Sequence, residues 1–211
     1  MNRFPKPSSA PRLPLDAVML LVLVLAACGG GGGDAPPVAT TPTTPTTPTT
    51  PTTPTNPTTP PAVVGTCDLP NFQQDLLTRI NALRAAGASC GSSGTFPPTT
   101  ALSWNINLTN AADAHALDMA TKNYFSHDSQ DGRSFADRIT AAGYSWSAAG
   151  ENIAAGQPTV ESVMSAWINS PGHCANLMSA SYVHVGVACR PAASTSNSYS
   201  RYWVMDLAKP R

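Results

Sequence analysis

Apolar side chains recur at spacings of three and four residues in several stretches of the chain, which is the period of an amphipathic helix. The clearest stretch covers residues 72–83, and Gly87 supplies a stop signal behind it. Comparable stripes predict three more helices, over about 108–123, over 134–142, and from 160 to a Ser-Pro-Gly stop at 170–172.

The last forty residues have a different pattern. Residues 183–188 and 202–205 hold alternating or β-branched apolar side chains, which is typical of strands. Helices that come first and strands that come last predict an α+β fold of packed layers. The chain is 42% hydrophobic, which is enough to bury the core of one domain of ordinary size.

The first 27 residues have the composition of a secretory signal. Arg3, Lys6 and Arg12 precede an uncharged apolar run over 17–27, as the basic region of a signal peptide precedes its hydrophobic region. The run is too short for a permanent transmembrane helix, which needs about 20 apolar residues. We therefore expect residues 1–27 to be removed as a signal peptide.

The expected cleavage site resembles the bacterial lipobox, in which the cysteine behind the cut receives lipid. It reads Leu25-Ala26-Ala27-Cys28. Acyl chains gain about 0.8 kcal/mol per buried methylene, so a multiply acylated cysteine holds a protein firmly on a bilayer. We expect membrane attachment through lipid on Cys28. Gly29 stands where some bacteria read an aspartate as a retention signal, which favours the outer membrane or cell surface as the site in the cell envelope.

Residues 28–65 have the composition of a linker. Five glycines follow Cys28, and Thr-Thr-Pro repeats run from 40 to 61. A proline at every third position favours polyproline II, which is stiff and extended. We expect a disordered N-terminal stalk that lifts one folded domain, residues 66–211, off the membrane. A glycan carrier or a ligand for proline-reading grooves is the alternative use of the repeats.

Charge is sparse and balanced. Charged residues make up 11% of the chain and the formal net charge is zero, so the basic surface of a nucleic-acid-binding protein is missing. We therefore expect no nucleic acid partner. The expected oligomeric state is a monomer.

Four cysteines in the predicted domain are expected to form two disulfides, because export favours oxidation. They are Cys67, Cys90, Cys174 and Cys189. A Cys67–Cys90 bridge is disfavoured, since the first helix between them would span about 24 Å, whereas bridged Cα atoms lie within about 7 Å. The pairing of Cys90 with Cys174 and of Cys67 with Cys189, and the crossed alternative, both stay open. None of the four has the Cys-x-x-Cys spacing of a zinc site.

Three short segments each combine an ionisable side chain with a turn signal. They are Tyr124–His127, Ala149–Ala154 and Ser170–Cys174. Two imidazoles and a carboxylate, from His127, His173 and Glu151, are the groups that a metal site or an acid/base pair would use. Their spacing alone does not say that they meet, and a histidine at a helix end is more often a cap than a ligand.

The residues from His115 to Met178 resemble the bacterial branch of the CAP superfamily, which comprises cysteine-rich secretory proteins, antigen 5 and plant pathogenesis-related proteins. The matching segments occur in the family's order. They are Ala111–Met119, Tyr124–His127, Asp131–Phe135, Ala142–Tyr144, Gly150–Ala154, Trp167–His173 and Tyr202–Trp203. The resemblance covers nearly all of residues 66–211 and excludes the signal segment and the stalk.

The resemblance implies an α-β-α sandwich, in which a small antiparallel sheet lies between helical layers, and a central cavity with two histidines and two acidic residues. Carried onto this chain, His127, Glu151 and His173 become the cavity residues and the candidate ligands of Zn²⁺ or another divalent metal. His115 is expected to pack or to line the cavity. The second acid of the eukaryotic members falls on Ser170, so the full set is absent.

Two details of the site also follow from the resemblance. Glu161, about two turns before Ser170, is the substitute acid that we consider, although its neighbours indicate a solvent face. Related bacterial sequences often carry the equivalents of Cys90 and Cys174 alone, which supports the pairing of these two cysteines and leaves Cys67 to Cys189. That bridge would hold the segment beside His173.

Three functions agree with these residues. The first is a lipid-anchored binding module whose cleft holds a divalent metal and whose grooves take a lipid, sterol or peptide ligand. The second is a zinc-dependent hydrolase or protease, with three ligands and one open position on the metal, in which Glu151 is the candidate catalytic residue. The third is a structural surface protein. Gly-x-Ser-x-Gly is absent, which argues against covalent catalysis by serine.

Overall fold

The computed structural model describes residues 65–211. The predicted signal peptide, the lipidation site Cys28 and the Thr-Thr-Pro stalk lie outside the described residues. No helix between residues 65 and 211 is long and apolar enough to cross a membrane.

A four-stranded sheet forms the centre of the domain, in the order β3, β5, β6, β4. The strands are β3 (Ser103–Trp104), β4 (Trp146–Ala155), β5 (His184–Pro191) and β6 (Arg201–Pro210). The three long strands pair antiparallel, as expected, whereas the short edge strand β3 runs parallel to β5. Strand β4 is therefore the second edge of the sheet.

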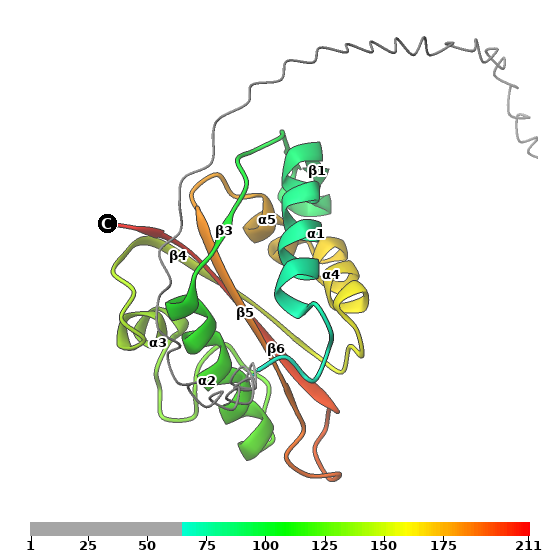
Figure 1. The fold of residues 1–211 in the computed structure, drawn as a ribbon, viewed down its shortest axis with the longest axis vertical. Coiled ribbons are helices and arrows are strands. Elements are labelled where there is room, and N and C mark those ends of the chain that lie inside the picture. Colours follow the sequence, from blue (N-terminus) through cyan, green and yellow to red (C-terminus); the bar gives the residue numbers. More distant parts are fainter. Residues whose placement is uncertain (1–64) are drawn as a thin grey trace, which may run out of the picture. The chain divides into compact units, whose positions relative to one another are not determined.

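Helices cover both faces of this sheet (Figure 1). On one face lie α2 (Ile106–Lys122) and α3 (Phe135–Ala141). On the other lie α1 (Phe72–Ala86), α4 (Val160–Asn169) and α5 (Pro171–Met178). The predicted α+β fold, an α-β-α sandwich, is confirmed.

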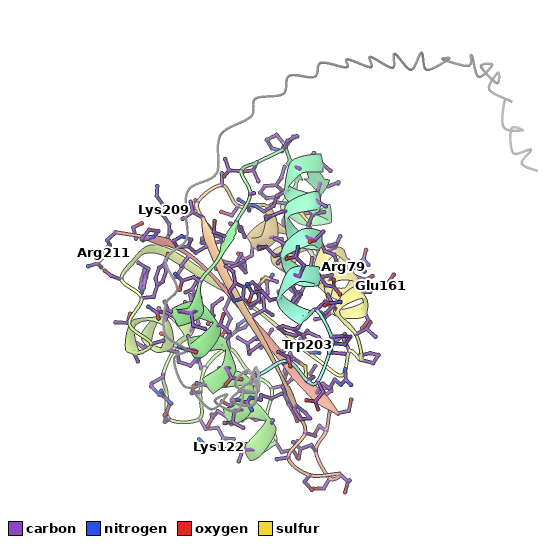
Figure 2. All side chains as sticks on the ribbon, in the orientation of Figure 1. Arg79, Lys122, Glu161, Trp203, Lys209 and Arg211 are labelled. Carbon is purple, nitrogen blue, oxygen red and sulfur yellow. A yellow bond between two sulfur atoms is a disulfide. The ribbon has the colours of Figure 1, made fainter. Side chains whose placement is uncertain are left out.

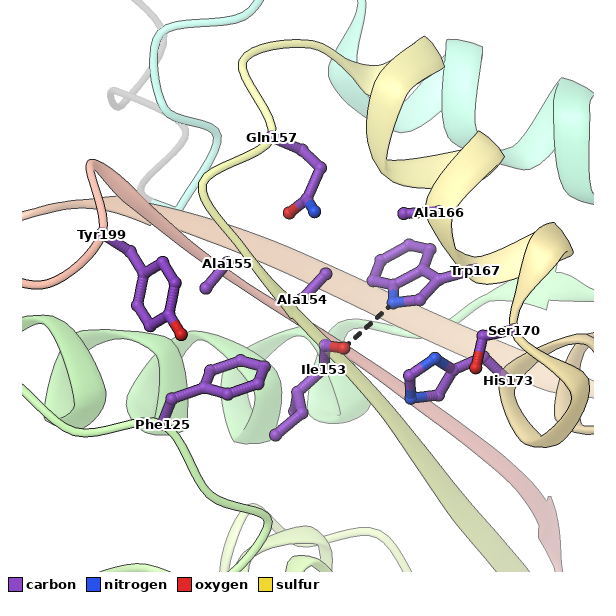
Figure 3. A pocket seen from close by; sticks show the side chains of 10 residues that line it. All are labelled: Phe125, Ile153, Ala154, Ala155, Gln157, Ala166, Trp167, Ser170, His173 and Tyr199. Carbon is purple, nitrogen blue, oxygen red and sulfur yellow. Dashed lines mark hydrogen bonds between the residues drawn. The ribbon is translucent and has the colours of Figure 1, made fainter.

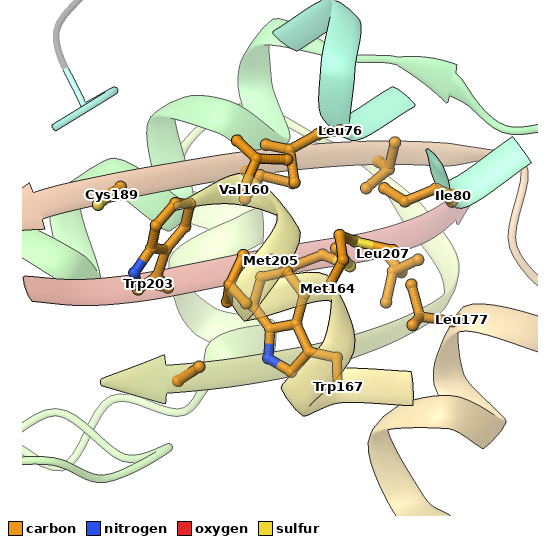
Figure 4. Close-up of a cluster of buried hydrophobic side chains, with 14 of the residues drawn as sticks. Leu76, Ile80, Val160, Met164, Trp167, Leu177, Cys189, Trp203, Met205 and Leu207 are labelled. Atoms are coloured by element: carbon orange, nitrogen blue, oxygen red, sulfur yellow. The ribbon is translucent and has the colours of Figure 1, made fainter. Parts of the chain in front are cut away.

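Side chains of β6 alternate between the two layers, and the strand is buried on both faces. Trp203, Met205 and Leu207 pack with the helices α1 and α4, as Figure 4 shows. Val204 packs with alanines of α2 on the opposite face. Asp206 follows the same alternation and therefore faces the α2 layer.

The four predicted helices are confirmed to within a few residues, and each begins where the chain offers a reason. Asn105 accepts hydrogen bonds from the first backbone N–H groups of α2. Ser134 and Thr159 form capping boxes at α3 and α4. Helix α5 is not predicted by the sequence pattern, because Ser-Pro-Gly at 170–172 is also a stop signal. Proline is equally suited to the first turn of a helix, and a new helix begins at Pro171.

Strand β4 was also missed. Its sequence, Trp-Ser-Ala-Ala-Gly-Glu-Asn-Ile-Ala-Ala, is rich in small residues and lacks the β-branched alternation of a strand. Pairing with β6 over almost the whole length of β4 imposes the extended conformation. Glu151 is thus a strand residue and not part of a Gly-flanked turn.

Two disulfides hold the domain, Cys67–Cys189 and Cys90–Cys174, and the pairing is the one that the family resemblance supports. Cys67–Cys189 ties the start of the domain to β5. Cys90 lies among three short elements, β1 (Ala88–Ser89), η1 (Gly91–Ser93) and β2 (Thr95–Phe96), and its bridge fixes them to α5. The second disulfide therefore ends one residue from His173.

A buried arginine also positions α5. Arg84 of α1 is completely buried, and Nη1 of its guanidinium donates to the backbone oxygens of Leu177 (2.6 Å) and Ser179 (3.0 Å). These carbonyls lie at the C-terminal end of α5, where helix carbonyls lack intrahelical partners. Arg84 thus satisfies the end of the helix whose beginning carries His173.

Candidate functional site

Glu151 is the centre of a buried polar cluster under the edge strand β4. Its side chain is 1% exposed, and both carboxylate oxygens are hydrogen bonded. Oε2 accepts from Nη2 of Arg138 at 2.7 Å, and Oε1 lies 2.7 Å from Nδ1 of His127. A buried carboxylate is costly unless it is paired, and here Arg138 supplies the opposite charge.

Arg138 belongs to α3 and reaches Glu151 through the interior. Its guanidinium also donates to the backbone oxygens of His127 (2.9 Å) and Arg133 (3.0 Å) and to Oγ of Ser129 (3.1 Å). The arginine therefore fixes both the carboxylate and the loop that presents His127. Nothing in the sequence pattern distinguishes it from a solvent-exposed arginine on an amphipathic helix.

His127 is the half-exposed member of the cluster. A carboxylate only accepts hydrogen bonds, so Nδ1 of His127 carries the proton in its hydrogen bond to Glu151. The hydrogen bond to Glu151 raises the pKa of His127, against the opposing effect of burial. The result is a histidine with a fixed tautomer and a fixed orientation.

His173 approaches the same cleft from the other helical layer. Its backbone oxygen accepts from Nδ2 of Asn152 at 3.0 Å, and Nδ2 of Asn176 donates to Oδ1 of Asn152 at 2.9 Å. Burial, and then the charge of His127, lower the pKa of His173. The structure thus brings His127, Glu151 and His173 to the edge of β4, where the two layers meet.

The other two histidines are packed within the fold, and His115 lies close enough to Glu151 and Arg138 to feel their charges. His115 is completely buried on α2, and its Nε2 lies 2.8 Å from the backbone oxygen of Ser126. Burial lowers its pKa, as expected for a packed histidine. Nδ1 of His184 lies 2.7 Å from the hydroxyl of Tyr144, so this residue pairs within the fold.

The second acid near Glu151 is Asp206, which the sequence analysis missed. It is 1% exposed and lies opposite Glu151 in the β4–β6 pairing. The signal that could have found it is a single charged residue inside the apolar run 202–208. Glu161, the substitute that we considered, is exposed on the outer surface of α4 near Arg79 of α1 (Figure 2).

A groove of about 270 Å³ opens along β4 beside this cluster. Figure 3 shows Trp167, Ser170 and His173 on one side of the strand, and Phe125 and Tyr199 on the other. The rings of Phe125 and Tyr199 lie 5.7 Å apart and are 42% and 41% exposed. The groove therefore has an apolar, aromatic wall and ends at a polar, imidazole-bearing wall.

The three predicted ligands do not fit a divalent metal. One carboxylate oxygen of Glu151 accepts a hydrogen bond from Arg138, and the other accepts one from the ring nitrogen of His127. Its charge is already compensated by a buried guanidinium, whose side chain is 2% exposed. Between residues 65 and 211, no group of three or more His, Cys, Asp or Glu side chains is placed to hold a metal ion.

Two curated proteins of Bacillus subtilis (strain 168) resemble part of the chain. The uncharacterized protein YkwD is 45% identical over 80 residues, which are 38% of this chain and 31% of that protein. The uncharacterized membrane protein YlbC is 34% identical over 101 residues, which are 48% of this chain and 29% of that protein. The matched segments thus span about a third of the length of these relatives.

Two solved structures share the fold. An extracellular protein with an SCP domain from Bacillus anthracis str. Ames has a TM-score of 0.52 and 26% identity, over 64% of this chain and 39% of that chain. An outer surface protein of Borrelia burgdorferi has a TM-score of 0.54 and 20% identity, over 65% of this chain and 92% of that chain. The second likeness concerns the fold alone.

The sequence profile of the cysteine-rich secretory proteins matches residues 77–207, which is more than half of the chain and includes His127, Glu151 and His173. The protein therefore belongs to the CAP family, the cysteine-rich secretory protein family.

Proposed function

We propose that this CAP domain is an extracytoplasmic binding module that takes an extended peptide in the groove along β4. One observation carries the proposal: an edge strand with outward-pointing N–H groups borders an apolar groove. Peptides commonly bind by adding a strand to such an edge.

The hydrogen-bond register of β4 gives the direction of these N–H groups. Gly156 donates from its backbone to Arg201, directly opposite. Because bonded and non-bonded pairs alternate in an antiparallel ladder, residues 151, 153 and 155 direct their backbone groups away from β6. The N–H groups of Ile153 and Ala155 therefore point toward the groove that these two residues line.

Several outward carbonyls of β4 are already occupied. The oxygens of Ala149, Glu151 and Ile153 accept from Tyr182 Oη (3.3 Å), Asn176 Nδ2 (3.2 Å) and Trp167 Nε1 (3.3 Å). These side chains cover most of an edge that would otherwise invite aggregation. Of the two residues with outward N–H groups, Ile153 is buried and Ala155 is partly exposed. The open part of the edge is therefore short, which suits the carbonyls of one peptide and not a long sheet-to-sheet contact.

Exposed aromatic side chains supply the apolar part of the site. Phe125 and Tyr199 present adjacent rings at the groove, and aromatic residues dominate the energetics of such surfaces. A lipid or sterol would use the same rings, but it would leave the N–H groups of β4 without acceptors. Zinc-dependent hydrolysis has less support, because both carboxylate oxygens of Glu151 already accept hydrogen bonds.

We further propose that residues 1–27 are a signal peptide, that Cys28 carries lipid, and that residues 28–65 are a stalk which holds the domain at the cell envelope. Two disulfides support an oxidising compartment outside the cytoplasm. Cys28→Ser should move the protein from the membrane fraction to the soluble exported fraction. Continued membrane association of this variant would contradict lipidation.

Peptide binding is tested with an acetylated hexapeptide of alternating valine and threonine, added to the full chain carrying Cys28→Ser. NMR should show shifts of the Ile153 and Ala155 amides, and Phe125→Ser or Tyr199→Ser should weaken binding about tenfold. Leu117→Ser is the matched control, because Leu117 is also exposed but lies on α2. Shifts confined to other surfaces, or binding of phospholipid vesicles and not of the peptide, would overturn the proposal.

A further inference from the structure

The buried polar cluster around Glu151 already contains a positively charged group, the guanidinium of Arg138. Arg138 and Glu151 form an ion pair at 2.7 Å, with side chains 2% and 1% exposed. Arg138 is held on the Glu151 side by three further acceptors in the loop that contains His127 and Ser129. It cannot swing aside without breaking these hydrogen bonds.

A divalent metal and a guanidinium compete for the same carboxylate. To bind a metal at full strength, Glu151 would have to offer oxygen lone pairs that now accept from Arg138 and His127. It would also place a double positive charge beside a buried arginine, where Coulomb repulsion is strong because little water screens it. The oxygen atoms of the cluster are thus arranged around the guanidinium of Arg138.

We propose that Arg138 is the resident cation of this cleft, and that Glu151 serves as the partner of Arg138 and His127 in place of serving as a metal ligand. In this arrangement Arg138 is a positioning residue. It holds the Glu151 carboxylate, and the carboxylate holds the His127 imidazole through Nδ1. The cleft of this CAP domain then keeps its geometry without a metal ion.

This inference is independent of the proposed peptide function, since it concerns what organises the cleft and not what binds in the groove. It predicts a specific gain of function. Removal of the guanidinium should leave a buried carboxylate next to His127 and close to His173, and that set should then attract zinc. A residue with a merely structural role would give a loss of stability without any gain of metal affinity.

The test is zinc titration by calorimetry of the full chain in a Cys28→Ser background, so that no free thiol competes for zinc. Wild type and Glu151→Gln should have the same zinc affinity within about a factor of two. Arg138→Met should bind zinc about tenfold more tightly or better, because the competing positive charge beside the carboxylate is gone. Arg138→Met with Glu151→Gln should lose that gain.

Arg133→Met is the matched control, because Arg133 pairs with Asp131 on the surface, with both side chains about half exposed. It should leave zinc affinity unchanged. If Arg138→Met folds only when zinc is present, added zinc should raise its melting temperature. The double variant, Arg138→Met with Glu151→Gln, should fold without zinc.

Three results would overturn the proposal. The first is wild-type zinc affinity that falls tenfold or more in Glu151→Gln. The second is a folded Arg138→Met that gains no zinc affinity. The third is an Arg138→Met that stays unfolded with zinc while the double variant folds.

Discussion

Glu151 and Asp206 lie opposite each other on β4 and β6, and only Glu151 has partners. Within the described part of the chain, neither carboxyl oxygen of Asp206 has a hydrogen-bond partner. Two adjacent buried carboxyl groups cannot both ionise at low cost. Burial, and then the charge of Glu151, raise the pKa of Asp206 well above its usual value. The two carboxyl groups thus differ in their surroundings, since Glu151 is paired with a guanidinium and Asp206 is not.

The substitution Asp206→Asn should therefore stabilise the domain more at neutral pH than at acid pH. Because its pKa is raised in the folded state, the contribution of the Asp206 carboxyl group to stability is fully present below its unfolded pKa near 3.8. That contribution is lost as the pH rises toward the folded pKa. The loss amounts to at most about 1.4 kcal/mol per pH unit. Asparagine removes this dependence.

Urea unfolding at pH 4 and pH 7 measures the effect. The difference in unfolding free energy between Asp206→Asn and wild type should grow in favour of the variant between these values. Asp68→Asn, the same substitution at an exposed position, should give a difference that stays flat. A variant that loses stability relative to wild type as the pH rises would show that Asp206 is ionised in the folded protein.

The titration of His127 gives a second prediction, for a base and not for an acid. The hydrogen bond to Glu151 raises the pKa of His127, so this pair stabilises the fold below the unfolded value near 6.5, and the contribution is lost as the pH rises through the folded value. NMR titration of the imidazole should show a lower pKa for His127 in Glu151→Gln. Glu161→Gln, an exposed change on α4, should leave that pKa where it is.

The sequence predicted the helices well because their apolar stripes are long and regular, as over residues 72–83. It did not predict the buried residues that surround Glu151. Arg138 occupies an ordinary position on a short helix, and only the fold shows that it turns inward to Glu151. Asp206 became visible as a second acid only when strand pairing placed it opposite Glu151. Partners of this kind are set by tertiary packing, and the sequence holds only one sign of them, the charge of Asp206 inside an apolar run.

The two disulfides should differ in their effect on the site although both stabilise the domain. They close loops with sequence separations of 84 and 122 residues, and replacing either pair by alanine should cost about 2–4 kcal/mol of unfolding free energy. Only Cys90–Cys174 ends next to His173 on α5. Its removal should therefore shift the NMR signals of the His173 ring.

Removal of Cys67–Cys189 supplies the control for that comparison. This bridge joins the start of the domain to β5, and its loss should lower stability while the His173 signals stay in place. Equal shifts of His173 in both variants would mean that the Cys90–Cys174 bridge has no particular part in positioning the cleft.

The close approach of α2 to the sheet depends on Gly186 of β5. A Cβ atom at this position would overlap the backbone of Leu108 and Thr109 at the start of α2. Backbone atoms cannot move aside as a flexible side chain can, so Gly186→Ala should cost about 1–3 kcal/mol of unfolding free energy. Gly172, at the exposed start of α5, has no atom within 4 Å of such a Cβ, and Gly172→Ala should gain about 0.5–1 kcal/mol from helix propensity. Thermal and urea unfolding of the two variants should therefore shift in opposite directions, and a neutral Gly186→Ala would show that α2 can lift from β5 without loss.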